Sequence, residues 1–234
     1  MKILKNVKLA KYTTFNVGGP AEFFVRLTYE DKKVFFIREL EQEVRMLSTR
    51  LVTRRLVLRP LLLRDAKDVQ ALAGDIRVAD TTLLIPHPYA DGLAEQWIKR
   101  TRRTFKKGDS LAFAILARTD DGEAEESFIG CMSLAIDKTR NAAELGYWIG
   151  YPYWNQGFAT EAGRAVIRFG LEVLGLERIA ATHLSRNPAS GCVMKKIGMM
   201  HVGRLRRSIQ KNGVFEDREL YEIIRSDYLG FNVP

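Results

Sequence analysis

The stretch from Glu144 to Leu174 constrains the fold more than any other part of the chain. Residues 144–149 are rich in aromatic, β-branched and other apolar side chains, which predicts a buried strand that Gly150 and Pro152 end. A tight loop follows at residues 155–157, and apolar residues then recur at steps of three and four, which predicts a long helix. A strand, a glycine-bearing loop and a helix in this order point free N–H groups and the positive helix end at one spot. The stretch therefore predicts a phosphate or pyrophosphate site, although an ordinary strand-to-helix turn would use the same glycine.

The amino-acid sequence of this stretch resembles a motif of a known protein family. Glu-Leu-Gly-Tyr-Trp-Ile-Gly, followed by Tyr-Trp-Asn-Gln-Gly-Phe-Ala-Thr-Glu-Ala, closely resembles the acetyl-CoA motif of the GNAT N-acetyltransferases, in particular the branch of the ribosomal-protein N-terminal acetyltransferases. The family pattern Arg/Gln-x-x-Gly-x-Gly/Ala is met at Gly157 and Ala159, whereas Trp154 stands at its first position. The resemblance implies acetyl-CoA as cosubstrate. It implies cofactor-binding roles for Trp148, Ile149, Gly150, Gln156, Gly157, Phe158, Ala159, Thr160 and Asn187.

The resemblance covers residues 51–228 and implies a GNAT-like α/β fold. We expect a largely antiparallel sheet of about seven strands with helices on both faces. The strands at 144–149 and 179–183 should run parallel, because a helix connects them, and in the family such strands splay apart to admit the pantetheine arm. Asp65 and Asp91 are predicted to cap helices, and Asn212-Gly213 predicts a hairpin.

The chemistry of amine acetylation needs few groups. An ammonium ion cannot attack a thioester, so a base must accept its proton, and the resemblance implies that Glu144 is this base in a partly desolvated position. A backbone N–H at Trp148 or Ile149 would bind the oxyanion. The resemblance places Met194 where many relatives have a tyrosine acid, which leaves Ser190 as the candidate acid. Two ordinary interpretations stay open: Glu144 as a surface partner of Arg140 or Lys138, and Ser190 as a helix cap.

Composition limits the partners. A net charge of +9 and a sequence pI of about 9.6 suit an anionic ligand or an acidic partner. Nucleic acid is the weaker choice, because no recognition motif accompanies the charge. Two cysteines predict a reducing compartment, the cytoplasm, and the histidines and cysteines show no metal-ligand spacing. No apolar run is long enough to span a membrane, and a homodimer is allowed.

Residues 1–47 look foreign to the domain predicted over 48–234. Residues 5–27 resemble the start of UDP-N-acetylenolpyruvoylglucosamine reductase, a flavoenzyme, and residues 34–47 predict a connecting helix. The later flavin-binding and catalytic segments of that enzyme have no counterpart, which argues against FAD binding and favours an appended remnant.

Three functions therefore follow from the sequence. The first is an N-acetyltransferase acting on a primary amine, either a small molecule or a protein N-terminus. The alternatives are a noncatalytic CoA-binding regulatory module and, least favoured, a flavin-linked oxidoreductase fragment.

Overall fold

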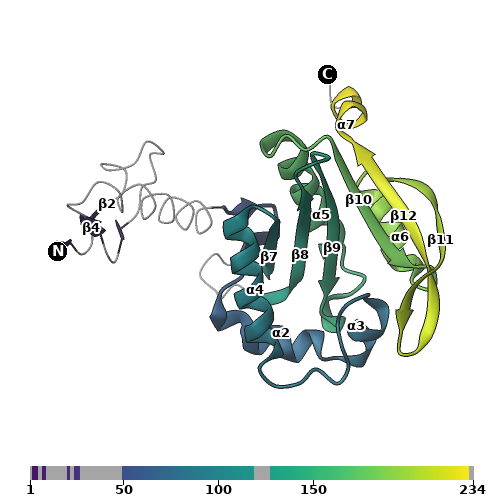
Figure 1. Cartoon of the computed structure of the whole chain (residues 1–234), viewed down its shortest axis with the longest axis horizontal. Helices are drawn as coiled ribbons and strands as arrows, with labels where there is room; N and C mark the ends of the chain where they lie inside the picture. The colour runs from purple at the N-terminus through teal and green to yellow at the C-terminus, as the bar shows by residue number, and fades with distance from the viewer. Residues whose placement is uncertain are drawn as a thin grey trace. The chain divides into compact units, whose positions relative to one another are not determined.

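The computed structural model describes residues 49–118 and 127–231, with side chains to residue 228, and four short strands near the N-terminus. The chain divides into two compact units, residues 1–49 and 50–234 (Figure 1). In the first unit, β1 (Lys2–Leu4) pairs with β4 (Phe24–Arg26) and β2 (Val7–Lys8) with β3 (Pro20–Ala21), both antiparallel. The helix predicted over 34–47 lies outside the described residues.

One sheet of eight strands organises the second unit, in the order β11-β12-β10-β9-β8-β7-β6-β5. The strands are β5 (Leu51–Val52), β6 (Leu56–Pro60), β7 (Ser110–Ala117), β8 (Ser127–Asp137), β9 (Ala142–Ile149), β10 (Arg178–Leu184), β11 (Met200–Lys211) and β12 (Val214–Ile224). Within this sheet β9 and β10 are parallel and the other neighbours antiparallel, as predicted. The sequence predicts about seven strands. The count is eight because a turn at Thr53, whose N–H donates to Leu56 O at 2.9 Å, folds β5 back onto β6.

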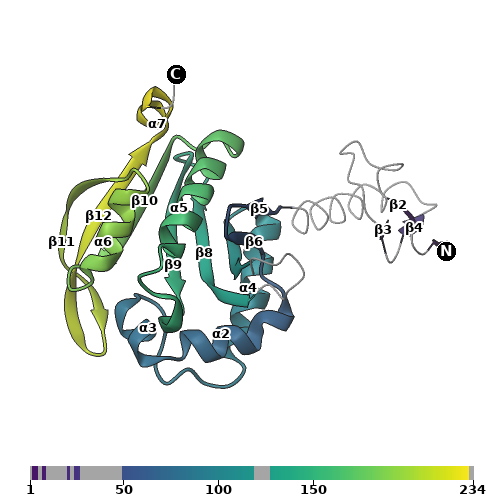
Figure 2. The ribbon, with the colours of Figure 1, turned by 180° about the vertical axis from the view of Figure 1, so that it is seen from behind.

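Helices cover both faces of the sheet, and each face has its own apolar core (Figures 1 and 2). One face carries α2 (Ala66–Ala73), α3 (Ile76–Thr81) and α4 (Leu93–Lys107). The other carries α5 (Phe158–Arg168), a π-helical turn η4 (Phe169–Val173) and α6 (Pro188–Lys196). Short 3₁₀ turns lie at η2 (Leu63–Asp65) and η3 (Tyr151–Tyr153), and α7 (Arg225–Phe231) follows β12.

Of the two predicted helix caps, Asp65 occupies the N-cap position of α2 without making the capping hydrogen bond, and Asp91 is wrong. Asp65 stands before α2, but its carboxylate forms an ion pair with Arg59 at 2.7 Å instead of accepting from the helix. The residue before α4 is Gly92, while Asp91 accepts a hydrogen bond from Gln70 at 2.6 Å. In both cases a nearby donor competes for the same oxygen atoms.

The central parallel pair separates at one end. The ladder joins residues 142–145 of β9 to residues 178–181 of β10, although β9 runs on to Ile149 and β10 to Leu184. The last residues of the two strands therefore do not pair with each other, which is the separation that the resemblance implies. The predicted hairpin is confirmed, with Asn212 and Gly213 at positive φ between β11 and β12.

Candidate active site

The loop between β9 and α5 presents open backbone donors. Gly157 precedes α5 with φ of 80°, a conformation that favours glycine. Glu161 N–H donates to Gly157 O at 3.0 Å, so the N–H groups of residues 158–160 come before the first bond of the helix. Gln156 and Gly157 are exposed, and residues 158–160 are half-buried. Such a helix start fits a diphosphate group without further residues.

Side chains within the loop hold its shape. Trp154, which stands at the first position of the family pattern, donates from Nε1 to Ile149 O at 2.7 Å and so holds the end of β9. Gln156 Nε2 donates to Pro152 O at 2.9 Å. Neither side chain carries a charge, so the positive contribution of the loop comes from its backbone and from the helix end.

The side chain of Arg55, at the start of β6, holds the same loop in place. We call these contacts the brace, and the sequence did not reveal them. Arg55 donates from Nη1 to Gln156 O at 3.0 Å, and its guanidinium lies 4.6 Å from the centre of the Phe158 ring. Its Nε donates to Glu161 at 2.7 Å. Burial acts to raise the pKa of Glu161, but hydrogen bonds from Thr53 and Arg55 outweigh it and hold that pKa below its usual value.

Glu144 lies on the sheet face that carries α2, α3 and α4, because side chains alternate along a strand and Trp148 belongs to the core of that face. The side chain is exposed, so the partly desolvated position expected from the sequence is wrong. The Thr182 hydroxyl on β10 donates a hydrogen bond to Glu144 Oε1 at 3.4 Å. The surface pairing weighed from the sequence does not occur: Arg140 pairs with Asp137, and Lys138 pairs with Asp109.

The backbone N–H of Ile149 faces the gap between β9 and β10. Gly150 N–H donates to Ile129 O on β8 at 2.8 Å. Successive N–H groups of a strand point to opposite edges, so the Ile149 N–H points to the edge where β10 has separated. This orientation favours Ile149 over Trp148 as the donor to a developing oxyanion, while the buried Trp148 ring packs against Phe128.

The start of α6 contains two of the predicted residues. Asn187 caps the helix, accepting from the Ser190 N–H at 3.3 Å. The Ser190 hydroxyl is not used as a cap; it lies 2.7 Å from the hydroxyl of Tyr147 on β9. Burial raises the pKa of Tyr147 to about 12, against a smaller opposing effect of the Ser190 hydrogen bond. Tyr147 thus joins Ser190 beside the gap. Its only sequence signal was its place within Gly-Tyr-Trp.

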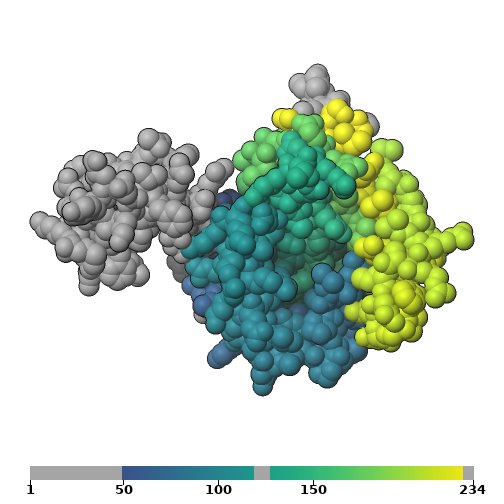
Figure 3. Space-filling model, viewed as in Figure 1, coloured from purple at the N-terminus to yellow at the C-terminus, as the bar shows by residue number. Residues whose placement is uncertain are grey.

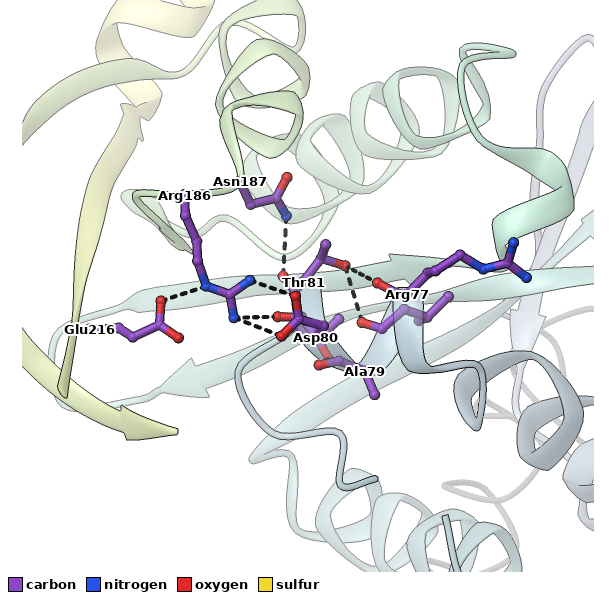
Figure 4. A network of polar contacts seen from close by, with 9 residues as sticks. Arg77, Ala79, Asp80, Thr81, Arg186, Asn187 and Glu216 are labelled. Carbon is purple, nitrogen blue, oxygen red and sulfur yellow. Dashed lines mark hydrogen bonds and ion pairs between the residues drawn. The ribbon is translucent and has the colours of Figure 1, made fainter. Parts of the chain in front are cut away.

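Figure 4 shows how the end of α3 is tied to the start of α6. Arg186 lies between two carboxylates, with 2.7 Å from Nη1 to Asp80 Oδ2 and 2.7 Å from Nε to Glu216 Oε2. Asn187 Nδ2 donates to Thr81 O at 3.1 Å. Hydrogen bonds from Glu216 and Asp80 raise the pKa of Arg186 above its usual value. The network fixes α3 against α6 and β12.

The face that carries α2, α3 and α4 is hollowed. Figure 3 shows the hollow between the teal surface near α4 and the blue surface near α3, with green residues at its floor.

Within the described residues, no group of three or more His, Cys, Asp or Glu side chains could hold a metal ion. No helix in the same part of the chain is long and apolar enough to cross a membrane.

Known proteins resemble this chain in sequence and in fold. Residues 55–200 match the family model of the acetyltransferase (GNAT) domain. Among curated proteins of Bacillus subtilis (strain 168), the "Uncharacterized N-acetyltransferase YoaA" is 35% identical over 91 residues, covering 39% of this chain. The "Putative ribosomal N-acetyltransferase YdaF" is 31% identical over 105 residues, covering 44% of this chain. The chain spans 51% and 57% of the lengths of these two relatives.

Solved structures of acetyltransferases share the fold of this chain. The "Structure of a putative ribosomal-protein-serine acetyltransferase from Vibrio cholerae" is 26% identical with a TM-score of 0.61, covering 76% of this chain and 99% of that one. The microcin C7 self-immunity acetyltransferase, solved with acetyl-CoA and AMP, shares the fold at 19% identity and a TM-score of 0.67, covering 76% and 98%.

Because the family model matches more than half of its residues, the chain belongs to the GNAT acetyltransferase family. Acetyl-CoA is the cosubstrate of that family. The matches do not support the resemblance of residues 5–27 to the reductase, which stays a prediction.

Proposed function

We propose that the protein transfers an acetyl group from acetyl-CoA to a primary amine, with a protein N-terminus as the favoured acceptor. The observation that carries the proposal is the separation of β9 and β10 beyond Leu145 and Ala181, directly before the loop at Gly157. A gap in the sheet next to open helix N–H groups suits a thioester arm that ends in a diphosphate.

The two faces of the sheet divide the work in this proposal. The loop and α6 lie on one face, whereas Glu144 and the hollow lie on the other. An amine entering through the hollow would meet the acetyl group at the gap and Glu144 beside it. The position of α3, fixed by Arg186 and Asn187, would define one wall of this entrance.

Each residue has a proposed task. Acetyl-CoA supplies an activated acetyl thioester. Glu144 accepts a proton from the entering ammonium, through a water molecule, and passes it to solvent, to which its side chain is exposed. The Ile149 N–H donates to the carbonyl oxygen as negative charge develops there. Ser190 donates its hydroxyl proton to the departing sulfur, and its oxygen takes the second proton from the nitrogen as the tetrahedral intermediate collapses.

The acceptor class rests on the relatives. Two of them carry names that refer to ribosomal or ribosomal-protein acetylation. A net charge of +9 on this chain would also favour an acidic protein as acceptor. Small amines are the competing class, because fold does not choose the substrate.

The test is a thiol-release assay with acetyl-CoA across peptides of varied N-terminus, polyamines, aminoglycosides and amino acids.

On the best acceptor, Glu144→Gln should lower kcat roughly 10²–10⁴-fold at pH 7 and leave acetyl-CoA affinity unchanged. The loss should shrink as the pH rises, since free amine then forms without a base. Glu177→Gln, an exposed glutamate paired with Arg225, is the matched control and should retain full kcat. Full turnover of Glu144→Gln at pH 7 would remove Glu144 from the mechanism, and no release with any amine would favour a noncatalytic CoA-binding module.

A further inference from the structure

Arg218, on β12, is a half-buried arginine that the proposed chemistry leaves unused. Its Nε donates to the Ser208 hydroxyl at 3.0 Å, and its Nη1 donates to the Thr182 hydroxyl at 3.4 Å. The other terminal nitrogen, Nη2, makes no hydrogen bond among the described residues, and it is not one of the buried atoms that lack a partner. Nη2 is therefore open to solvent and can donate to a ligand.

Arginines close to Arg218 in the sheet have carboxylate partners, whereas Arg218 forms no ion pair within the part of the chain that the structure describes. Arg186 lies between Asp80 and Glu216, as Figure 4 shows, so the acid two residues before Arg218 is already paired. Arg178 on β10 pairs with a glutamate of β12 at 3.6 Å. The charge of Arg218 is thus not offset by a direct partner among the described residues, and it can bind an anion.

Arg218 and Glu144 lie on the same face of the sheet. Tyr221 and Ile223 of β12 belong to the core beneath α5 and α6, so alternation places Arg218 on the opposite face, the one with the hollow. One hydroxyl joins the two charged groups: Thr182 Oγ1 lies 3.4 Å from Glu144 Oε1 and 3.4 Å from Arg218 Nη1. A carboxylate and a guanidinium therefore stand on either side of Thr182.

Arg218 is also close to the open end of the parallel pair. In the antiparallel ladder of β10 and β12 it lies opposite Leu184. The ladder between β9 and β10 ends at Ala181, so Arg218 neighbours the segment of β10 that has separated from β9. An acceptor that enters through the hollow would meet this guanidinium beside Glu144.

We propose that Arg218 determines the acceptor by binding a carboxylate that lies next to the reacting amine. This inference rests on the proposed function and narrows its acceptor class to primary amines with a neighbouring carboxylate, above all a protein N-terminus that begins with an acidic residue. Glu144 attracts the ammonium group and Arg218 attracts the carboxylate, so the two side chains match both charges of such an acceptor. A polyamine would bring a second cation towards the guanidinium and is disfavoured.

The first test compares two acceptors that differ in one charge. Two peptides, amidated at the C-terminus and identical except that one begins with aspartate and the other with asparagine, are used with the full chain in the thiol-release assay. We expect kcat/KM to be about tenfold higher for the aspartate peptide, chiefly through its KM. Arg218→Gln should bring this ratio to about one, and Arg218→Lys, which keeps the charge, should restore most of it.

Arg178→Gln is the matched control, because Arg178 lies on the same sheet face but already has a carboxylate partner. Its tenfold ratio should be retained. A ratio near one in the wild type, or a ratio that survives in Arg218→Gln, would overturn the role of Arg218 and leave acetyl transfer to amines standing.

The second test needs no turnover and therefore separates this inference from the proposed function. Calorimetry with the protein saturated with CoA compares the same two peptides, and also alanine with alaninamide, which differ in the carboxylate of a free amino acid. The aspartate peptide should bind about tenfold more tightly than the asparagine peptide, and Arg218→Gln should abolish the difference. Selection within the alanine pair alone would identify a free amino acid as the source of the carboxylate. No selection in either pair would refute the inference, whereas selection that depends on Arg218 without any acetyl transfer would refute the proposed function alone.

Discussion

The loop after β9 and the start of α6 are proposed to bind the two ends of acetyl-CoA, yet they are built in different ways. The loop is local: Trp154, Gln156 and Gly157 lie within four residues, and its donors are backbone N–H groups at one helix end. The start of α6 is assembled from distant parts of the chain, with Tyr147 from β9 beside Ser190.

This difference predicts that the affinity for acetyl-CoA and the rate of acetyl transfer depend on different regions. Backbone N–H groups and a helix end bind charge but exchange no protons at neutral pH. Hydroxyls beside the gap can move protons but offer little to a diphosphate. Changes in the loop should therefore alter cofactor affinity, and changes at the start of α6 should alter kcat.

The largest expected effect is at the loop. Gly157→Glu places a side chain at φ of 80° and a carboxylate next to the open N–H groups. Acetyl-CoA affinity, measured by calorimetry, should fall at least about 100-fold, or ~2.7 kcal/mol. Turnover of acetyl-pantetheine, which lacks the diphosphate, should be nearly unchanged.

Gly175→Glu is the matched control for backbone strain. Gly175 has φ of 69°, and a Cβ there meets nothing within 4 Å. If both variants lose acetyl-CoA alike, strain and not the diphosphate site explains the loss, and the comparison between the two regions fails.

The sequence predicted the loop and the order of elements well, because strand and helix periodicity are local properties. It missed the groups whose partners are distant. Nothing near Tyr147 indicates that Ser190, 43 residues later, lies at its hydroxyl. The exposure of Glu144 was also missed, since apolar neighbours on a strand lie on its opposite face. Asp91 failed as a cap because Gln70, 21 residues earlier, binds it.

An intermediate effect is expected at the brace. Arg55→Met removes the guanidinium that donates to Gln156 O and covers the Phe158 ring. Acetyl-CoA affinity should fall about tenfold, or ~1.4 kcal/mol, with acetyl-pantetheine turnover unchanged. Arg55→Lys should recover little of it, because an ammonium group lacks the planar fork that contacts Glu161 and Gln156 together. Arg54→Met, an exposed neighbour, controls for net charge. Equal losses in Arg54→Met and Arg55→Met would show a general charge effect and no brace.

The smallest effect is expected from the N-terminal unit. The sheet and both apolar cores are built from residues after 50, and the family model begins at residue 55. Deleting residues 1–49 should therefore leave acetyl-CoA affinity and kcat within about twofold of the full chain, measured by calorimetry and thiol release.

Five phenylalanines between residues 15 and 36 give the opposite result a physical basis, because so much apolar surface seldom stays in water. A truncated protein that binds a hydrophobic dye and melts without cooperativity would show that this segment completes the core of the enzyme. A truncated protein that folds but loses kcat alone would place the segment in the chemistry at the start of α6, and one that loses affinity alone would place it at the loop.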